Sequence, residues 1–369
     1  MSGGIIIIAS ILAILFVIAA EVYPLFKKPA VEFLGTRSPV TATAPGPGVA
    51  AGVDEYREVG YTVGAGGVLE LVGLKGDRRL AGVPIPGLDG ARVSTVAALG
   101  KGRHLIGTSD GRVIALDMRF DVAFKDGKRE VTPSPAFAAP SILDPEKKRP
   151  LLRVTGAEPP GGPLTVAQVG PRALVIQSVV EKKALVGGSR REESLATVEV
   201  PTAGEITALA LDGRGEDLFV GTSTGEAIHY DMRDRQVPRP LDQVAVTGKP
   251  GVGVTALGFL IGDRTLVVGD HGGGVSTWQV VPPPGGGERR LTRIYQFAGH
   301  TGPVVSIDAS KRDKGFATAD TSGSVLVHYG TSGHTLLTLK APEGGLHSVV
   351  FAPKADGIVL VSRQGAMSE

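Results

Sequence analysis

The sequence predicts an all-β protein, a six- or seven-bladed β-propeller preceded by a single transmembrane α-helix. Two observations predict the propeller. Short polar turns that end in glycine recur along the chain, most of them 42 to 50 residues apart. A short apolar strand precedes each turn and an alternating strand follows it, which is the pattern of a four-stranded blade. One observation predicts the helix: the first two dozen residues are mostly apolar.

The composition suits many short strands joined by tight turns. Glycine (53) and proline (26) are plentiful, whereas aromatic residues make up 5% of the 369 residues. Lys and Arg (39) nearly balance Asp and Glu (37), so the net charge of +2 gives no reason to expect a nucleic-acid partner. The chain has no cysteine, which excludes disulfides, thiolate zinc sites and a cysteine nucleophile.

The N-terminal segment has the length and hydropathy of a membrane span. Residues Ile5–Ala20 carry no charge, and a helix continued to Phe26 would be about 33 Å long, enough to cross a bilayer core of roughly 30 Å. The alternatives are a cleaved signal peptide and a buried core helix. The opening MSGG lacks the basic residues of a signal peptide, and four consecutive isoleucines leave no polar face for a core helix. We therefore predict a transmembrane anchor over residues 1–26.

A tether and one large domain follow the anchor. Residues 27–54 are rich in Pro, Gly, Ala and Thr and have almost no periodic pattern, so we predict a tether there. Residues 55–369 form the predicted propeller domain. Lys27 and Lys28 after the span favour a cytoplasmic propeller, but this signal is weak because long domains translocate regardless of a few charges.

Four turns define the repeat, and their glycines are the site residues that the sequence predicts, in a structural role. They occur in GTSDGRVIALD, GTSTGEAIHYD, GDHGGGVSTWQ and ADTSGSVLVHY, and are Gly111, Gly225, Gly273 and Gly323. Weaker copies lie at Gly67 and Gly365. We predict φ > 0 at these glycines, in the hairpin between the two middle strands of a blade, where a Cβ costs about 1 kcal/mol.

The number of blades follows from the spacing. The gap of 114 residues between Gly111 and Gly225 corresponds to about two periods with an insertion, which includes a charged hairpin around Lys182–Glu193. Seven turns, one of them unseen, predict six or seven blades. The chain stops where the last blade should lay down its outer strand. Either the strand near Tyr56–Val63 closes the ring or the last blade is truncated, and we favour truncation.

No residue set predicts a catalytic, cofactor or metal site. The sequence has no P-loop, and no two of its seven histidines have the spacing of metal ligands. We predict that His300, in AGHTGPV, hydrogen-bonds within its blade, and that His229 and His328 occupy equivalent positions of the repeat. The acidic residues at turns, which we expect to accept backbone N–H bonds, are Asp110, Asp231, Asp270 and Asp320. The basic clusters, which we interpret as solvated hairpin tips, are Lys147–Arg149, Lys182/Lys183, Arg190/Arg191 and Arg289/Arg290.

The segments EVYPLF, GDHGGGVSTWQVV and DKGFATADTSGSVLVHYGTSGHTLL, in this order, resemble the extended permease subunit of bacterial phosphate ABC transporters of the Pst type. Some of these permeases carry a WD-repeat-like periplasmic domain after their first membrane helix. The resemblance implies an inner-membrane protein with a single span, a propeller in the periplasm, and three partners: the partner permease, the ATPase and the phosphate-binding protein. The remaining membrane helices of a permease are missing, because no later segment approaches 18 apolar residues.

These observations lead to one prediction of function and one alternative. The prediction is a membrane-anchored, non-catalytic accessory domain of a phosphate transporter that faces the periplasm and binds other proteins. The alternative is a membrane-anchored propeller that serves envelope assembly and is unrelated to phosphate. An enzyme is the third hypothesis, which the lack of convergent acid, base or metal-binding residues disfavours.

Overall fold

The structure, a computed structural model, describes residues 2–23, 30–38, 50–76, 78, 80–146, 148–183, 189–341 and 345–369, without the side chains of residues 2, 3, 5, 6, 181–183 and 189–191. The chain divides into two compact units, Met1–Phe33 and Leu34–Glu369. The first unit contains helix α1 (Ser2–Val22), and the second contains strands β1 to β29.

Helix α1 lies within the predicted anchor, residues 1–26. Residues 24–29, where the anchor should end, lie outside the described part of the chain. Within the part of the chain that the structure describes, no helix is long and apolar enough to cross a membrane. The transmembrane helix in the predicted fold class is therefore not supported.

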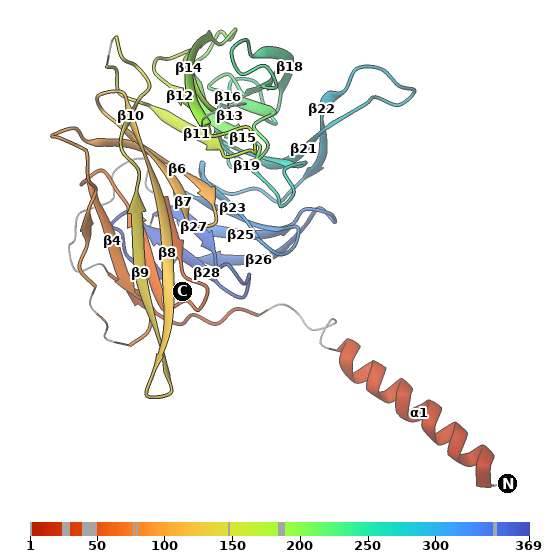
Figure 1. The fold of residues 1–369 in the computed structure, drawn as a ribbon. Coiled ribbons are helices and arrows are strands. Elements are labelled where there is room, and N and C mark those ends of the chain that lie inside the picture. Colours follow the sequence, from red (N-terminus) through yellow and green to blue (C-terminus); the bar gives the residue numbers. More distant parts are fainter. Residues whose placement is uncertain are drawn as a thin grey trace. The chain divides into compact units, whose positions relative to one another are not determined.

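The second unit is a seven-bladed β-propeller, which confirms the all-β propeller and fixes the number of blades within the predicted range (Figure 1). Strands are given from the inside of each blade outward. Blade 1 contains β2 (Ala50–Val53), β3 (Val59–Val63), β4 (Val68–Gly73) and β5 (Val83–Pro84). Blade 2 contains β6 (Val93–Gly100), β7 (Arg103–Thr108) and β8 (Arg112–Lys125), and β8 pairs with both β9 (Lys128–Phe137) and β10 (Ser141–Ile142).

The next four blades are regular. Blade 3 contains β11 (Arg153–Ala157), β12 (Leu164–Gln168), β13 (Ala173–Lys183) and β14 (Ser189–Glu199). Blade 4 contains β15 (Ile206–Leu211), β16 (Asp217–Thr222), β17 (Glu226–Asp231) and β18 (Arg239–Ala245). Blade 5 contains β19 (Val254–Phe259), β20 (Leu266–Asp270), β21 (Val275–Val281) and β22 (Arg290–Gln296). Blade 6 contains β23 (Val304–Ala309), β24 (Gly315–Asp320), β25 (Ser324–Tyr329) and β26 (His334–Lys340).

The ring closes through a strand that precedes blade 1. Blade 7 contains β27 (Leu346–Phe351), β28 (Ile358–Ser362), β29 (Met367–Ser368) and, as its outer strand, β1 (Thr36–Arg37). Thr36 is paired with Ser368, and Arg37 with Met367. The seventh sheet therefore has four strands and is not truncated. The segment that we considered for closure, Tyr56–Val63, instead contains β3, the second strand of blade 1.

Packing also shows a closed ring. The inner strands contact one another in the cyclic order β2, β6, β11, β15, β19, β23, β27 and back to β2. Among the described residues, each pair of neighbouring blades shares one buried apolar cluster. The cluster between blades 7 and 1 includes Val53 and Leu74 from blade 1, and Ala352 and Met367 from blade 7.

The structure places propeller strands within the predicted tether. The segment 27–54 contains β1 and β2, and the boundary between the two compact units falls after Phe33. Residues 39–49 between these strands lie outside the described part of the chain. The predicted charged hairpin, Lys182–Glu193, includes the end of β13 and the start of β14; residues 184–188 and the side chains of 182, 183 and 189–191 lie outside the described part of the chain.

Candidate functional site

Each blade has two ends, and the chain uses them differently. At one end lie the turns between second and third strands, together with the connections from each blade to the next. We call this end the turn-glycine face. At the other end lie the loops between first and second strands and the hairpins between third and fourth strands, and we call it the hairpin face. Because consecutive strands are antiparallel, all blades present the same set of loops on each face.

The turn glycines have the left-handed backbone that gives the turn-glycine face its shape. The values of φ are 82° at Gly111, 89° at Gly225, 86° at Gly273 and 92° at Gly323. Each turn lies against the connection to the next blade. A Cβ on Gly273 would overlap the carbonyl oxygen of His300, for example. The turns therefore support the segments that lead into the inner strands.

The inner strands carry a repeated irregularity at this face. In five blades the pairing of the first strand with the second shifts after the first residue, so that the second residue forms a β-bulge. The bulged residues are Ser94, Thr207, Thr255, Val305 and His347. The residue before each one is buried, and the bulged side chains themselves are partly exposed. Bulges re-aim side chains and recur next to functional sites. We call these five residues the bulge ring.

The bulge ring is chemically mild. The hydroxyl of Ser94 donates to the carbonyl oxygen of Leu151 at 2.7 Å, and that of Thr255 donates to the carbonyl oxygen of Gly269 at 3.3 Å. The hydroxyl oxygen of Thr207 is buried and has no hydrogen-bond partner among the described residues. Hydroxyl groups, one imidazole and one aliphatic side chain can make polar and apolar contacts with another surface.

The inner strand of blade 3 has no bulge and begins with an arginine. Strand β11 pairs with β12 without a shift, and Arg153 is its first residue. The guanidinium of Arg153 donates to the side chain of Gln168 at 2.8 Å and to the carbonyl oxygen of Ile206, in blade 4, at 3.1 Å. Burial lowers the pKa of Arg153, and the charge of Glu205 works against this shift. Arg153 thus joins two blades beside the bulge ring.

The predicted hydrogen bond of His300 is present in blade 6. Its Nε2 atom lies 2.7 Å from the hydroxyl of Thr318, which in turn lies 3.0 Å from Nε2 of His328. Its Nδ1 atom lies 3.5 Å from the carboxylate of Asp320. Burial and the neighbouring His300 lower the pKa of His328 to about 3. Burial also lowers the pKa of His300, which Asp320 partly opposes. The network holds the inside of the blade together and includes no exposed group.

Two further histidines are also structural. Nε2 of His104 in blade 2 lies 2.8 Å from the hydroxyl of Tyr61 in blade 1, and burial lowers the pKa of His104 to about 4. His229 occupies in β17 the place that His328 occupies in β25, since both are paired with a phenylalanine of the second strand. The ring of His229 stacks on Phe219, and its Nε2 lies 2.7 Å from Asp217.

Three of the four turn aspartates accept backbone N–H bonds. They accept them from residues two or four positions ahead: Asp231 from Arg233, Asp270 from Gly274, and Asp320 from Ser322 and Ser324. Burial works against the ionisation of Asp320, but these bonds, the hydroxyl of Ser322 and the charge of His300 hold its pKa below the usual value. The aspartates therefore shape the turns.

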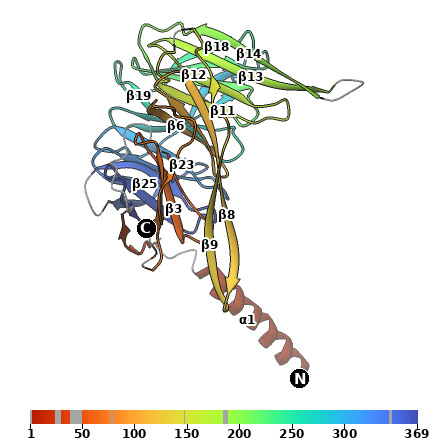
Figure 2. The same ribbon diagram turned by 60° about the vertical axis from the view of Figure 1, so that its left-hand side comes forward.

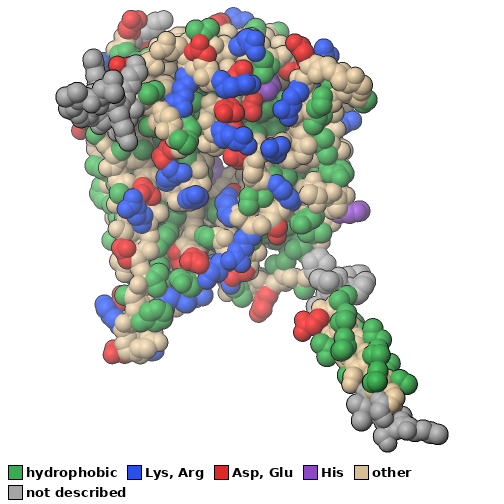
Figure 3. All heavy atoms as spheres, turned by 45° about the vertical axis from the view of Figure 1, so that its right-hand side comes forward, with side chains coloured by type: hydrophobic (Ala, Val, Ile, Leu, Met, Phe, Trp, Pro, Cys, Tyr) green, Lys and Arg blue, Asp and Glu red, His purple; other side chains and the backbone are tan. Residues whose placement is uncertain are grey.

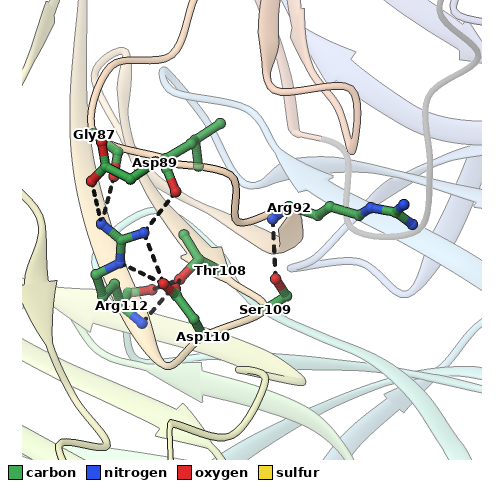
Figure 4. Close-up of polar contacts among 8 residues, drawn as sticks. Gly87, Asp89, Arg92, Thr108, Ser109, Asp110 and Arg112 are labelled. Carbon is green, nitrogen blue, oxygen red and sulfur yellow. Dashed lines mark hydrogen bonds and ion pairs between the residues drawn. The ribbon is translucent and has the colours of Figure 1, made fainter.

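Asp110 differs because it holds an arginine (Figure 4). The guanidinium of Arg112 bonds to the carboxylate of Asp110 at 2.9 and 2.8 Å and to that of Asp89 at 2.9 Å. The carbonyl oxygens of Gly87 and Leu88 accept its remaining bonds, both at 2.7 Å. These bonds tie the connection from blade 1 to the turn of blade 2. Arg112 is engaged in this way and does not offer a free cation to an anionic ligand.

Charges of both signs are mixed on the surface that Figure 3 shows, and no large patch of one sign covers it. Of the predicted basic clusters, Arg149 pairs with Asp144 at 2.8 Å, and Arg289 donates to the carbonyl oxygen of Val280 at 2.9 Å. Lys147 and the side chains of Lys182, Lys183, Arg190 and Arg191 lie outside the described residues. The described part of the chain contains no group of three or more His, Cys, Asp or Glu residues that could hold a metal ion.

The comparisons with known proteins define a fold. No protein-family model matches the chain, and no curated protein matches it. Among solved structures, the chain is similar to the β-propeller domain of Myceliophteria thermophila Cps50 (Swd1), with a TM-score of 0.57 and 13% identity over 90% of this chain and 98% of that one. It is also similar to Chaetomium thermophilum Raptor, with a TM-score of 0.57 and 14% identity over 90% of this chain and 29% of that one.

These similarities support the β-propeller fold of the second unit. At such low identity they show the fold alone. They also overturn the resemblance to the extended permease of phosphate transporters, because the similar structures are WD40 propellers and no match supports a permease. The phosphate-transporter function and its three partner subunits are therefore withdrawn.

Sequence reasoning found the turn glycines but missed the bulge ring. The alternation in ITALAL and VTALGF predicts inner strands, whereas a one-residue shift in pairing leaves no mark on that alternation. A weak signal was present. In Ile206–Thr207 and Val254–Thr255 a buried β-branched residue is followed directly by a small hydroxyl residue, at the same place in the repeat.

Proposed function

We propose that this chain is a non-catalytic scaffold that binds a protein partner on the turn-glycine face of its propeller. The observation that carries the proposal is the bulge ring, in which five of the seven blades present the equivalent residue at the same end of the inner strands. A repeated, partly exposed and mildly polar ring is suited to contact with a surface. The fold similarity to WD40 propellers supports an interaction role in general terms.

A pair of matched positions tests the proposal. Val305 belongs to the bulge ring and is 36% exposed, and Ile261 lies in the loop between β19 and β20 on the hairpin face and is 38% exposed. A photo-crosslinking amino acid at Val305 should trap a partner in cells of the native host, and the same group at Ile261 should not. With the crosslinking group at Thr255, the bulged residue of blade 5, Val305→Arg should abolish the trapped product with the thermal midpoint unchanged. Equal trapping from both positions would refute the assignment of the face.

We also propose that the N-terminal segment tethers the propeller to a membrane, which corresponds to an envelope scaffold unrelated to phosphate. The support is the uncharged run Ile5–Ala20 in the sequence and the exposure of the described side chains of α1. Alkaline carbonate should leave the full chain in the membrane fraction and should release a variant that lacks residues 1–33. Release of both would contradict the tether.

The location that belongs to this proposal is the bacterial inner membrane, with the propeller in the periplasm. A large domain can cross a membrane despite the two lysines, Lys27 and Lys28, that follow the apolar run. A phosphatase reporter fused after Glu369 should be active if the propeller is periplasmic. An inactive phosphatase, together with an active cytoplasmic reporter at the same position, would place the propeller in the cytoplasm.

A further inference from the structure

The hairpin of β8 and β9 extends beyond the rest of its blade (Figures 1 and 2). Strand β8 is paired with β7 as far as Asp117 and then continues, paired with β9 alone, to Lys125. At about 3.3 Å per residue, this continuation is roughly 25 Å long. The turn residues Asp126 and Gly127 have φ of 50° and 73°, which is typical of a tight two-residue hairpin turn.

The side chains of β8 on one face of this hairpin are apolar, and they become more exposed toward the tip. Phe120, Val122 and Phe124 alternate along β8 and therefore share a face, and Val131 lies opposite Val122 in β9. Near the base, Phe120 contacts the ring of Tyr61, and Val131 is fully buried. Farther out, Val122 is 44% exposed and Phe124 is 72% exposed. An exposed phenylalanine on a projecting strand leaves apolar surface in water unless something covers it.

The hairpin is held against blade 1 almost to its tip, through residues of β9. The guanidinium of Arg129, opposite Phe124, bonds to the carboxylate of Glu58 at 2.6 Å and lies 3.9 Å from the centre of the Tyr56 ring. Arg78 also bonds to the carbonyl oxygen of Val131. A two-stranded hairpin alone is only marginally stable. These contacts with blade 1 therefore stabilise the projecting part of the hairpin.

The β8–β9 hairpin is connected by side-chain contacts to the point where the chain enters the propeller. The N–H of Leu34 donates to the carbonyl oxygen of Glu369 at 2.7 Å, and the side chain of Glu369 pairs with Arg57 at 2.5 Å. Arg57 is followed by Glu58, which binds Arg129 of the hairpin. An uninterrupted set of contacts thus links the entry of the chain, on the hairpin face, to the tip of the β8–β9 hairpin.

We infer that Val122 and Phe124 rest in the surface of the lipid bilayer to which the N-terminal segment tethers the chain. The inference rests on the proposed tether. A bilayer is the occupant that the chain itself brings to this place, because the apolar run Ile5–Ala20 precedes the entry at Leu34. Aromatic and aliphatic side chains at a protein edge gain by insertion at the boundary between headgroups and acyl chains.

The charges at the tip predict how the contact depends on lipids. Lys125 pairs with Glu130 at 2.9 Å, and Asp126 offsets the charge of Lys128 in sequence. The tip is therefore close to neutral. Its attachment should depend on apolar burial and should change about twofold or less when anionic lipid is added.

The absence of cysteine from the chain makes a labelling experiment direct. In full-length protein in phosphatidylcholine nanodiscs, Val122→Cys and Leu152→Cys carry the same environment-sensitive fluorophore. Leu152 is a matched control because it is 46% exposed and lies on the turn-glycine face. We expect a blue shift and quenching by spin-labelled lipid at position 122 and neither at position 152. Adding Phe124→Ser should remove both effects at position 122.

Several results would overturn the inference. They are equal quenching at both positions, no quenching at position 122, or a blue shift at position 122 that is already present without lipid and follows self-association. Failure of the tether is a separate outcome, seen as protein that does not co-migrate with the discs. In that case, flotation of the propeller unit, residues 34–369, with phosphatidylcholine vesicles tests whether the hairpin binds lipid by itself. Binding that Phe124→Ser weakens at least tenfold supports the inference, and no binding overturns it.

Discussion

Replacing turn glycines by alanine should destabilise the propeller in graded steps that the structure ranks. Gly323 has φ of 92°, and a Cβ there would meet its nearest atom, Cβ of Ala341, at an ordinary 3.4 Å. Gly323→Ala therefore costs only the strain of a left-handed backbone, about 1–2 kcal/mol. Gly273 has φ of 86°, but its Cβ would overlap the backbone oxygen of His300. Gly273→Ala should cost about 1–3 kcal/mol more, because backbone has to move.

Gly248 provides the control. A Cβ there meets no atom within 4 Å and its φ lies outside the left-handed region, so Gly248→Ala should change stability by less than about 0.5 kcal/mol. The assay is thermal and urea unfolding followed by circular dichroism. For a unit of this length, each kcal/mol should lower the midpoint by roughly 1–2 °C. The larger substitution Gly323→Val should lower the midpoint further, within one cooperative transition.

Two results would refute this reasoning. If Gly323→Ala were as silent as Gly248→Ala, the strained turn would not contribute to the stability of the blade. If Gly273→Ala and Gly323→Ala were equally destabilising, the close approach of the His300 carbonyl would not matter. In either case the turns could not be regarded as supports for the connections between blades.

The remaining predictions concern pH and ring closure. Buried His104 and His328 have pKa values of about 4 and about 3, against 6.5 when unfolded, so stability should be full above pH 6.5 and fall as the pH drops toward 4. The slope is at most about 1.4 kcal/mol per pH unit for each histidine. In urea unfolding at several pH values, His104→Gln should flatten the profile and exposed His334→Gln should not; parallel profiles for all three proteins would contradict this. Removing residues 1–33 should leave the propeller stable, whereas removing residues 1–37 deletes β1 and should cost about 2–4 kcal/mol by thermal melting, and equal midpoints would contradict closure by β1.

Much of the architecture was predictable because the repeat contains glycines at turns whose backbone conformation other residues adopt only at a cost. A tight hairpin turn requires positive φ, and glycine supplies it at little cost, so the spacing of such glycines gives the period of the blades. Blade 3 was hidden because its turn contains Gly170 followed by Pro171, and Gly170 has no positive φ. The turn of blade 3 therefore lacks the positive-φ glycine by which the other blades can be recognised in the sequence.

Ring closure was not predictable from the sequence pattern. Strand β1 consists of Thr36 and Arg37 alone, and two residues cannot show an alternation. The strand is defined by its partners: the hydroxyl of Thr36 lies 2.8 Å from that of Ser368, more than three hundred residues away. Such a strand is specified by tertiary contacts, which local propensity does not encode. This is why truncation was the preferred reading of the last blade.

The loop Glu55–Glu58 contacts both the blade that closes the ring and the β8–β9 hairpin. Each of its four side chains contacts a neighbouring blade: Glu55 pairs with Lys354, Tyr56 lies under Lys354 and Arg129, Arg57 binds Glu369, and Glu58 binds Arg129. The loop thus spans the junction between blades 7 and 1 and contacts the β8–β9 hairpin near its tip. The loop therefore contacts both the hairpin, through Arg129, and Glu369, which follows the strand β29 that pairs with β1. On the hairpin face, the loop Glu55–Glu58 therefore joins the closure of the ring to the β8–β9 hairpin, at the opposite end of the blades from the bulge ring.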